Sequence, residues 1–440
     1  MHTLPNIVYI HGHDVGRMIA PYGYNTPTPN LQRFAESAIT FRQAFSAAPT
    51  CSPSRAALLT GRFPHCCGMH GLATPAFGFK LEHPEHHLSN FLKENGYTTA
   101  LAGNQHEARA PLLDMATLGY DHWLNYTADG ALKREETVGA ATRFIEQHHE
   151  HPFFLSCGFG ETHRENDNRG RRHTRDADVP NVDELDGRYT RPPAPIPDTA
   201  TTRQDWQSFR LGAERLDAKI GAVIAAIDRR GLQDDTLVIV TADHGIAWPH
   251  GKGNLTDMGL GVLLMMRGPR GSGFEGGRVT DALVSHMDVY PTLCEWLRLE
   301  PPPWLQGESL LPIVDGRAES IRDHVFGEQG WHGWQMDPQR SVRTERYKYI
   351  RRKPLKTHLR IVDPGPTNDW LRDLGYCERP NEVELLYDLY FDPVELHNVA
   401  DDPEYAGELT KLRSLVDQWM KETEDPFIDD TIPEPVDATK

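Results

Sequence analysis

The sequence lacks an excess of positive charge and lacks any long apolar run. Its 440 residues carry a formal net charge of -17. General nucleic-acid binding depends on lysine and arginine side chains that neutralise phosphates, and a membrane span requires a long stretch of apolar residues. We therefore expect no nucleic-acid partner and no membrane span, and any anionic substrate needs a local basic pocket.

The sequence also lacks a disulfide-like arrangement of cysteines. The adjacent pair Cys66 and Cys67 has poor geometry for a structural bridge. The chain enters an apolar strand near residue 6, which leaves no room for a secretory signal peptide. Both features lead us to expect a reducing, cytoplasmic location. The six cysteines are Cys51, Cys66, Cys67, Cys157, Cys294 and Cys377.

Short apolar runs alternate with helical patterns through most of the chain. Such runs are typical of strands buried on both faces of a parallel sheet, and each run here ends in polar residues. An open α/β sheet carries its site beyond the carboxyl ends of its strands, so we expect the site there. The predicted strands are residues 6–10 (NIVYI), 97–102, 152–157 (PFFLSC) and 236–241 (TLVIVT), and the predicted helices are residues 29–37, 54–59 and 205–229.

A chain of 440 residues is too long to fold around one ordinary hydrophobic core, so we predict a large domain and a second, smaller domain. For residues 1–322 we predict an α/β fold with a large, mixed, mostly parallel sheet sandwiched by helices. For residues 323–424 we predict a smaller α+β domain with an antiparallel sheet, including segments 325–328 and 341–351 and a helix at 404–421. Residues 425–440 are acidic and proline-rich, and we expect a docked or disordered tail.

The most specific motif is CSPSRAALLTG at residues 51–61. Pro53 suits a first helical turn, so Cys51 is expected at a helix N-terminus near Arg55, where the pKa of a thiol falls. A small buried residue would be the structural alternative. The motif resembles the sulfatase signature that begins C-x-P-S-R, and this resemblance implies that Cys51 is oxidised to formylglycine. In such enzymes the hydrated aldehyde attacks sulfur and then expels sulfate.

Two strand ends offer metal ligands, and both resemble sulfatase motifs. TADHG at residues 241–245 is similar to the family's T-S-D-[NH]-G, and GHDVG at residues 12–16 stands where most sulfatases have A-D-D-x-G. The resemblance implies one divalent metal, Ca²⁺ in the family, and the imidazoles move the preference toward Mn²⁺ or Zn²⁺. The implied metal site is made of His13, Asp14, Cys51, Asp243 and His244.

The place of His13 stays open at this stage. It stands where the family has an aspartate ligand, and a hydrogen-bonding role outside the ligand set is an alternative. His11 lies two residues earlier and therefore on the same side of the strand. A zinc pair of His11 and His13 is a second alternative, with less weight because the full hydrolase pattern is not completed.

The remaining site residues follow from the same resemblance. His106 matches an active-site histidine, whereas Asn104 stands in place of a lysine that binds sulfate. His163 matches the histidine that protonates the leaving oxygen or nitrogen, and Lys252 matches a second sulfate-binding lysine. Arg55 would neutralise charge beside the nucleophile. Catalytic roles are thus expected for Cys51, Arg55, His106, His163 and Lys252, and substrate binding for Asn104, His163 and Lys252.

The resemblance extends from residue 5 to about residue 400 and identifies the chain as a member of the formylglycine-dependent sulfatases of the alkaline phosphatase superfamily. DHGIAWP at residues 243–249 looks most like the heparan N-sulfatase branch. The implied substrate is a small anionic sulfate ester or sulfamate, including one carried by a sugar or an aryl or alkyl group. The implied partner is a formylglycine-generating or anaerobic sulfatase-maturating enzyme, and homo-oligomerisation is left open.

Two other functions are compatible with these residues. A phosphonate monoester or phosphodiester hydrolase shares the fold and the modified cysteine, and Asn104 together with a softer metal favours that reading. A non-catalytic, anion-binding homologue would keep the pocket with Cys51 unmodified. Hydrolysis rates on sulfur and phosphorus esters distinguish the first alternative, and the mass of residue 51 distinguishes the second.

Overall fold

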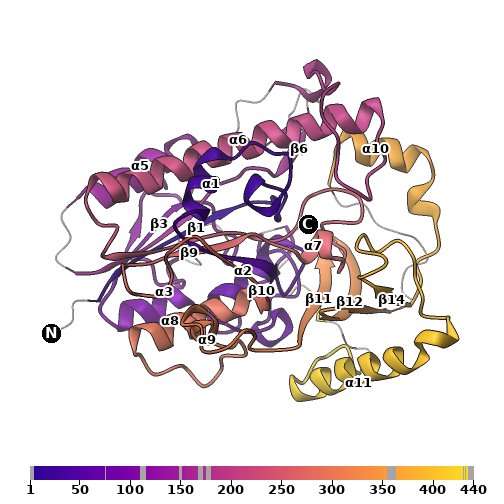
Figure 1. Ribbon diagram of the computed structural model, residues 1–440. Helices are drawn as coiled ribbons and strands as arrows, with labels where there is room; N and C mark the ends of the chain where they lie inside the picture. The colour runs from indigo at the N-terminus through magenta and orange to yellow at the C-terminus, as the bar shows by residue number, and fades with distance from the viewer. Residues whose placement is uncertain are drawn as a thin grey trace.

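The central feature of the fold is a sheet of eight strands in the order β10-β2-β9-β8-β1-β5-β3-β4 (Figure 1). The computed structural model describes residues 4–74, 76–109, 115–147, 151–166, 172–174, 180–353, 363–429, 431 and 433–434. All neighbours in this sheet are parallel except β9, which runs antiparallel to β2 and β8. The strands are β1 (Asn6–Gly12), β2 (Ile39–Phe45), β3 (Thr98–Gly103), β4 (His122–Trp123), β5 (Phe153–Gly158), β8 (Thr236–Ala242), β9 (Leu264–Arg267) and β10 (Arg278–Ser285).

Helices cover both faces of this sheet, as Figure 1 shows. Helices α1, α5 and α6 lie on one face, and α2, α3, α8 and α9 lie on the other. The sheet is therefore the middle layer of a sandwich, as predicted. The helices are α1 (Pro29–Ala35), α2 (Cys51–Thr60), α3 (Leu88–Glu94), α5 (Thr137–Glu146), α6 (Ala200–Arg229), α8 (Val289–Leu297) and α9 (Leu311–Val314).

The central strands are apolar because both of their faces are covered. Every residue of β5 and β8 is buried, and their continuous runs of apolar side chains fill the space between the helical layers. Helix α6 begins at Ala200, earlier than the predicted residue 205. Its start is set by a capping box between Thr199 and Thr202, which satisfies the first free N–H groups of the helix.

A second, antiparallel sheet of four strands follows in the order β11-β12-β13-β14. Helix α11 (Ala406–Glu422) packs against it through an apolar cluster that includes Val342, Tyr349 and Leu412. The segment predicted at 341–351 is divided between two strands that pair antiparallel, so it contains a turn. The predicted fold class is confirmed. The strands are β11 (His324–His332), β12 (Gln335–Thr344), β13 (Tyr347–Arg352) and β14 (Glu384–Asp388).

Buried charges join the second sheet to the loop that follows β8. Asp257, the first residue of α7 (Asp257–Leu260), lies 2.9 Å from Nζ of Lys348 on β13 and 3.4 Å from the guanidinium of Arg343 on β12. Lys348 is fully buried, and the carboxylates of Asp257 and Glu395 compensate its charge. The second sheet thus fixes the loop that carries Asp243 and Lys252.

The C-terminal segment is docked where the structure describes it. Asp425 accepts a hydrogen bond of 2.7 Å from the buried Arg340, and Nε1 of Trp331 donates to the carbonyl of Pro433. Residues 430, 432 and 435–440 of the predicted tail lie outside the described part of the chain. The domain boundaries placed after residues 322 and 424 stay predictions.

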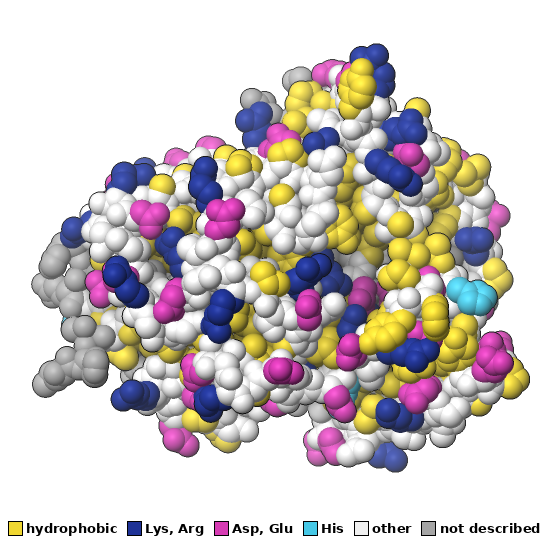
Figure 2. All heavy atoms as spheres, viewed as in Figure 1, with side chains coloured by type: hydrophobic (Ala, Val, Ile, Leu, Met, Phe, Trp, Pro, Cys, Tyr) yellow, Lys and Arg dark blue, Asp and Glu magenta, His cyan; other side chains and the backbone are white. Residues whose placement is uncertain are grey.

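The surface carries side chains of both charges, as expected for a sequence with more Asp and Glu than Lys and Arg. Figure 2 shows Lys and Arg side chains interspersed with Asp and Glu over the viewed face. All six cysteines are free thiols. Within the described ranges, no helix combines the length and the apolar character that a bilayer crossing needs.

Candidate active site

Two neighbouring parallel strands bring their polar ends together. Gly12 of β1 is in register with Ala242 of β8, so the residues that follow the two strands lie side by side. The backbone N–H of Asp14 donates a hydrogen bond of 2.9 Å to Oδ1 of Asp243. The strand-end arrangement predicted from the sequence therefore exists, and both carboxylates are buried.

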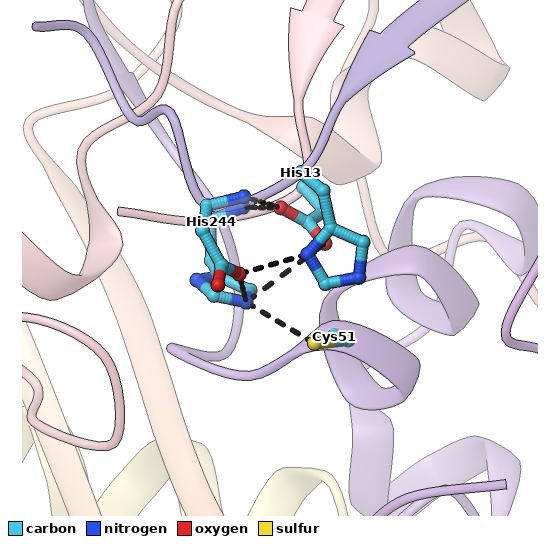
Figure 3. A group of neighbouring side chains, drawn as sticks. His13, Cys51 and His244 are labelled. Carbon is cyan, nitrogen blue, oxygen red and sulfur yellow. Dashed lines mark hydrogen bonds and ion pairs between the residues drawn. The ribbon is translucent and has the colours of Figure 1, made fainter. Parts of the chain in front are cut away.

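Cys51 reaches the same point as the first residue of helix α2. Its Sγ lies 3.4 Å from Nε2 of His244, and Figure 3 shows the sulfur directed toward that ring from the start of the helix. Every residue of α2 is buried. Burial alone would raise the pKa of the Cys51 thiol, but Lys252 and His13 hold that pKa well below its usual value.

The signature motif holds the helix against Asp243. The hydroxyl of Ser54 donates to the carbonyl of Asp243, and the guanidinium of Arg55 donates to Oδ2 of the same residue at 3.0 Å. The side chain of Arg55 is 1% exposed, so its charge is compensated by this carboxylate. A Cβ at Gly245 would lie 1.8 Å from the carbonyl oxygen of Met258, so only glycine fits here.

The donor atoms at this point suit a divalent metal. Each residue of the set offers one atom, and these atoms lie within 4.8 Å of one another. Two carboxylates and two imidazoles match the oxygen and nitrogen preferences of Mn²⁺ and Zn²⁺, and the carboxylates also suit Ca²⁺. Because the set is buried and acidic, a bound cation would offset the repulsion between its carboxylates. The set consists of His13, Asp14, Cys51, Asp243 and His244.

The two histidines of the set respond to these carboxylates. Nδ1 of His13 lies 2.9 Å from Oδ1 of Asp14, and Nε2 of His244 lies 3.1 Å from the same oxygen. Burial lowers the pKa of each imidazole, but Asp243 and Asp14 outweigh it, so both pKa values are raised. A metal that binds here must displace these protons, so its affinity will rise with pH.

His11 lies outside the donor set. Its Nε2 lies 3.4 Å from the guanidinium of Arg55, a contact in which the imidazole accepts. Burial and the charge of Arg55 lower the pKa of His11 well below its usual value, which keeps the ring neutral. The geometry places His11 with Arg55 and His13 with the acidic pair, and it does not bring them together as a pair of ligands.

Lys252 is held between two carboxylates. Its Nζ lies 2.9 Å from Oδ2 of Asp14 and 2.8 Å from Oδ2 of Asp363, and its side chain is 1% exposed. These carboxylates outweigh burial and raise the pKa of Lys252. Asp363 was not found from the sequence, because it belongs to no recognised motif. It lies 111 residues from Lys252 along the chain, so only the fold brings it here.

The other predicted residues surround the donor set. The ring of His163 lies edge-on to that of His13 with centroids 4.6 Å apart, and the ring of His106 lies at 5.6 Å. Asn104 is 5% exposed, and its backbone N–H donates to the carbonyl of Gly158 at the end of β5. All ten residues singled out from the sequence therefore gather at the carboxyl ends of β1, β3, β5 and β8, together with the start of α2.

Comparison with known families shows the class of protein to which this chain belongs. The family model "Sulfatase" matches residues 5–299, and the chain belongs to the sulfatase family. A second model, "N-sulphoglucosamine sulphohydrolase, C-terminal", matches residues 250–364. Sulfatases are hydrolases, and the chain is an enzyme of that class.

The most informative relatives come from different sources. N-sulphoglucosamine sulphohydrolase of Homo sapiens is 29% identical, over 91% of this chain and 86% of its own length. An ulvan-active sulfatase of Formosa agariphila is 27% identical, over 94% and 74%. Among solved structures, a sulfatase from the glycosaminoglycan metabolism of Bacteroides thetaiotaomicron has a TM-score of 0.71 at 19% identity, covering 95% of this chain and 100% of that one.

A phosphonate monoester hydrolase of Silicibacter pomeroyi shares the fold as well. Its TM-score is 0.68 at 19% identity, and the match covers 95% of this chain and 96% of that one. A likeness at this level shows the fold and leaves the substrate to the residues of the site.

Proposed function

We propose that this chain hydrolyses a sulfate ester or sulfamate, carried by a sugar, through a formylglycine made from Cys51 and one divalent metal. The observation that carries the proposal is the position of Cys51. Cys51 is the first residue of a fully buried helix, and its Sγ lies in one cluster with the carboxylates and imidazoles that could bind a metal. The relatives whose names include sulphoglucosamine and ulvan support a sugar as the carrier of the group.

Each residue has a defined task in this proposal. Asp14, Asp243, His13 and His244 hold the metal, which supplies positive charge that stabilises the reacting anion. The hydrated aldehyde at position 51 supplies the nucleophilic oxygen. Arg55 fixes Asp243 and adds positive charge beside the nucleophile.

The remaining side chains act on the substrate. Lys252 donates a hydrogen bond to an oxygen of the sulfuryl group, and Asn104 offers its neutral amide to the same group. His106 lies next to residue 51. His163 gives a proton to the departing oxygen or nitrogen. The proposal also requires a formylglycine-generating or anaerobic maturating enzyme in the source cell, and we expect a cytoplasmic location.

Two measurements test the proposed function together. Peptide mass analysis of protein from a host with a maturating enzyme should show residue 51 with the sulfur and two hydrogens replaced by one oxygen. Initial rates on aryl sulfates, a sulfamate and aryl phosphonates should be highest with the sulfur compounds. An unconverted Cys51 in that host would favour an anion-binding protein over an enzyme.

A second candidate is a phosphonate monoester or phosphodiester hydrolase. The observation that favours it is Asn104, which removes one fixed positive charge from the place where sulfatases carry a lysine. On the same substrate panel, phosphonate hydrolysis that exceeds sulfate hydrolysis by orders of magnitude would establish this alternative and reject the first.

Replacement of His163 by alanine is expected to lower the rate of hydrolysis by different factors for different substrates. A proton is needed only when the leaving oxygen or nitrogen is strongly basic, so the loss should reach roughly 10² to 10³-fold for poor leaving groups and stay small for nitrophenolate. The measurement is the slope of log kcat/KM against leaving-group pKa, which should become steeper. His122→Ala, at an exposed histidine on β4, is the control. An equal loss for all leaving groups would contradict the proton-donor role.

A further inference from the structure

A second carboxylate lies in the anion-binding part of the site, where negative charge is unexpected. Asp363 is 8% exposed, and its Oδ2 accepts a hydrogen bond of 2.8 Å from Nζ of Lys252. Among the residues that the structure describes, Asp14 and Asp363 are the acceptors of this ammonium. An ammonium has three N–H donors, so one of them remains for an oxygen of a bound anion.

Asp363 and the residues that follow it are anchored by two contacts. Its carbonyl accepts from Nδ2 of Asn368 at 2.8 Å, on helix α10 (Pro366–Asp373). The N–H of Thr367 donates to Oδ2 of the buried Asp205 on α6, and Oδ1 of Asp205 accepts from Arg164 at 2.7 Å. Arg164 directly follows His163 in the chain. Asp205 therefore links the segment that carries Asp363 to the segment that carries His163, the proposed proton donor.

Asp363 lowers the net positive charge that the side chains of the site place around the anion. Asn104 replaces one of two expected lysines, and Arg55 is matched by Asp243. The charge of Lys252 is shared between Asp14 and Asp363. A sulfate ester or sulfamate carries one negative charge, whereas inorganic sulfate and a phosphate monoester carry up to two. The second charge of a dianion would lie close to Asp363 and be repelled.

The geometry points to Asp363 as a charge-selecting residue that favours singly charged tetrahedral groups over doubly charged ones, an inference that rests on the proposed function of this site. The substrate enters with one charge, and its hydrolysis yields inorganic sulfate with two. Asp363 therefore discriminates against phosphate monoesters and also weakens the binding of the product sulfate. Lys252 still binds the monoanion, because its remaining N–H donates a hydrogen bond to one of the anion's oxygens.

The test compares the affinities of a monoanion and a dianion in metal-loaded protein. Isothermal titration gives the Kd of methyl sulfate and of inorganic sulfate for the native protein and for Asp363→Asn. We expect the variant to shift the ratio of the two Kd values about tenfold toward the dianion, the size that one extra charge near a carboxylate gives in partly screened surroundings. Asp363→Glu keeps the charge and should keep the native ratio.

A carboxylate elsewhere in this segment provides a second control. Asp369→Asn removes a carboxylate from helix α10, which follows Asp363 in the chain; Asp369 pairs there with Arg372 at 2.7 Å, and its loss should leave the ratio unchanged. If Asp363→Asn changes both Kd values by the same factor, or changes neither, Asp363 serves only the structure and the inference is overturned. If the ratio shifts while the native protein hydrolyses no sulfate ester, charge selection holds and the proposed function fails.

Discussion

Replacement of Cys51 by alanine is expected to lower the rate of sulfate ester hydrolysis by a factor on the order of 10⁴ or more. Loss of a covalent nucleophile removes the step on which turnover depends, and the rest of the site supplies only residual catalysis. The methyl group of alanine fits the buried start of α2, and the hydrogen bonds of Ser54 and Arg55 to Asp243 stay in place. The loss should therefore appear in kcat, with the melting temperature close to that of the native protein.

The measurement is the rate on an aryl sulfate, made on protein in which residue 51 has been checked by mass. Cys377→Ala provides a matched control, because it removes another free thiol that lies outside the donor set. Turnover of Cys51→Ala at more than a few per cent of the native rate would show that another group attacks sulfur. In that case the cluster of donors would bind a metal without a nucleophile at position 51.

The strands that carry the site were predictable because they are buried on both faces. Residues 236–241 and 6–10 were predicted from continuous apolar runs, and the structure has β8 at Thr236–Ala242 and β1 at Asn6–Gly12. Strands such as β2, with Arg42 and Gln43 in its middle, carry no such run and were missed. Its pairing with β9 and β10 depends on contacts that are remote in the sequence.

The site was predictable where one motif contains several of its members. The motif at residues 51–61 places Cys51 and Arg55 on a single helix. The ends of β1 and β8 each contribute two adjacent side chains, at residues 13–14 and 243–244. Asp363 had no such signal, since its contact with Lys252 arises from the docking of α10 on α6. The orientation of His11 toward Arg55 was also beyond the sequence, because strand periodicity gives the side of a sheet and does not give the partner.

Replacement of Asp14 by asparagine is expected to abolish tight metal binding and to lower turnover about 10³-fold or more. Asp14 joins three groups of the site: Oδ1 lies near the imidazoles of His13 and His244, and Oδ2 accepts from Lys252. The amide keeps the shape but removes one anionic oxygen from the cluster, and a divalent cation contributes several kcal/mol to stabilisation of the reacting anion. Lys252 keeps Asp363 as a partner, so the fold should survive.

The loss of metal can be measured without any turnover. A bound ion stabilises the folded state in proportion to the logarithm of its concentration over Kd, so added Ca²⁺, Mn²⁺ or Zn²⁺ should raise the melting temperature of the native protein. Asp14→Asn should remove that rise. Asp217→Asn removes a buried carboxylate that caps α1 and lies outside the donor set, so it should lower stability and keep the rise. A metal-dependent rise that persists in Asp14→Asn would place the ion elsewhere, and the shared strand-end site would then lose its proposed role.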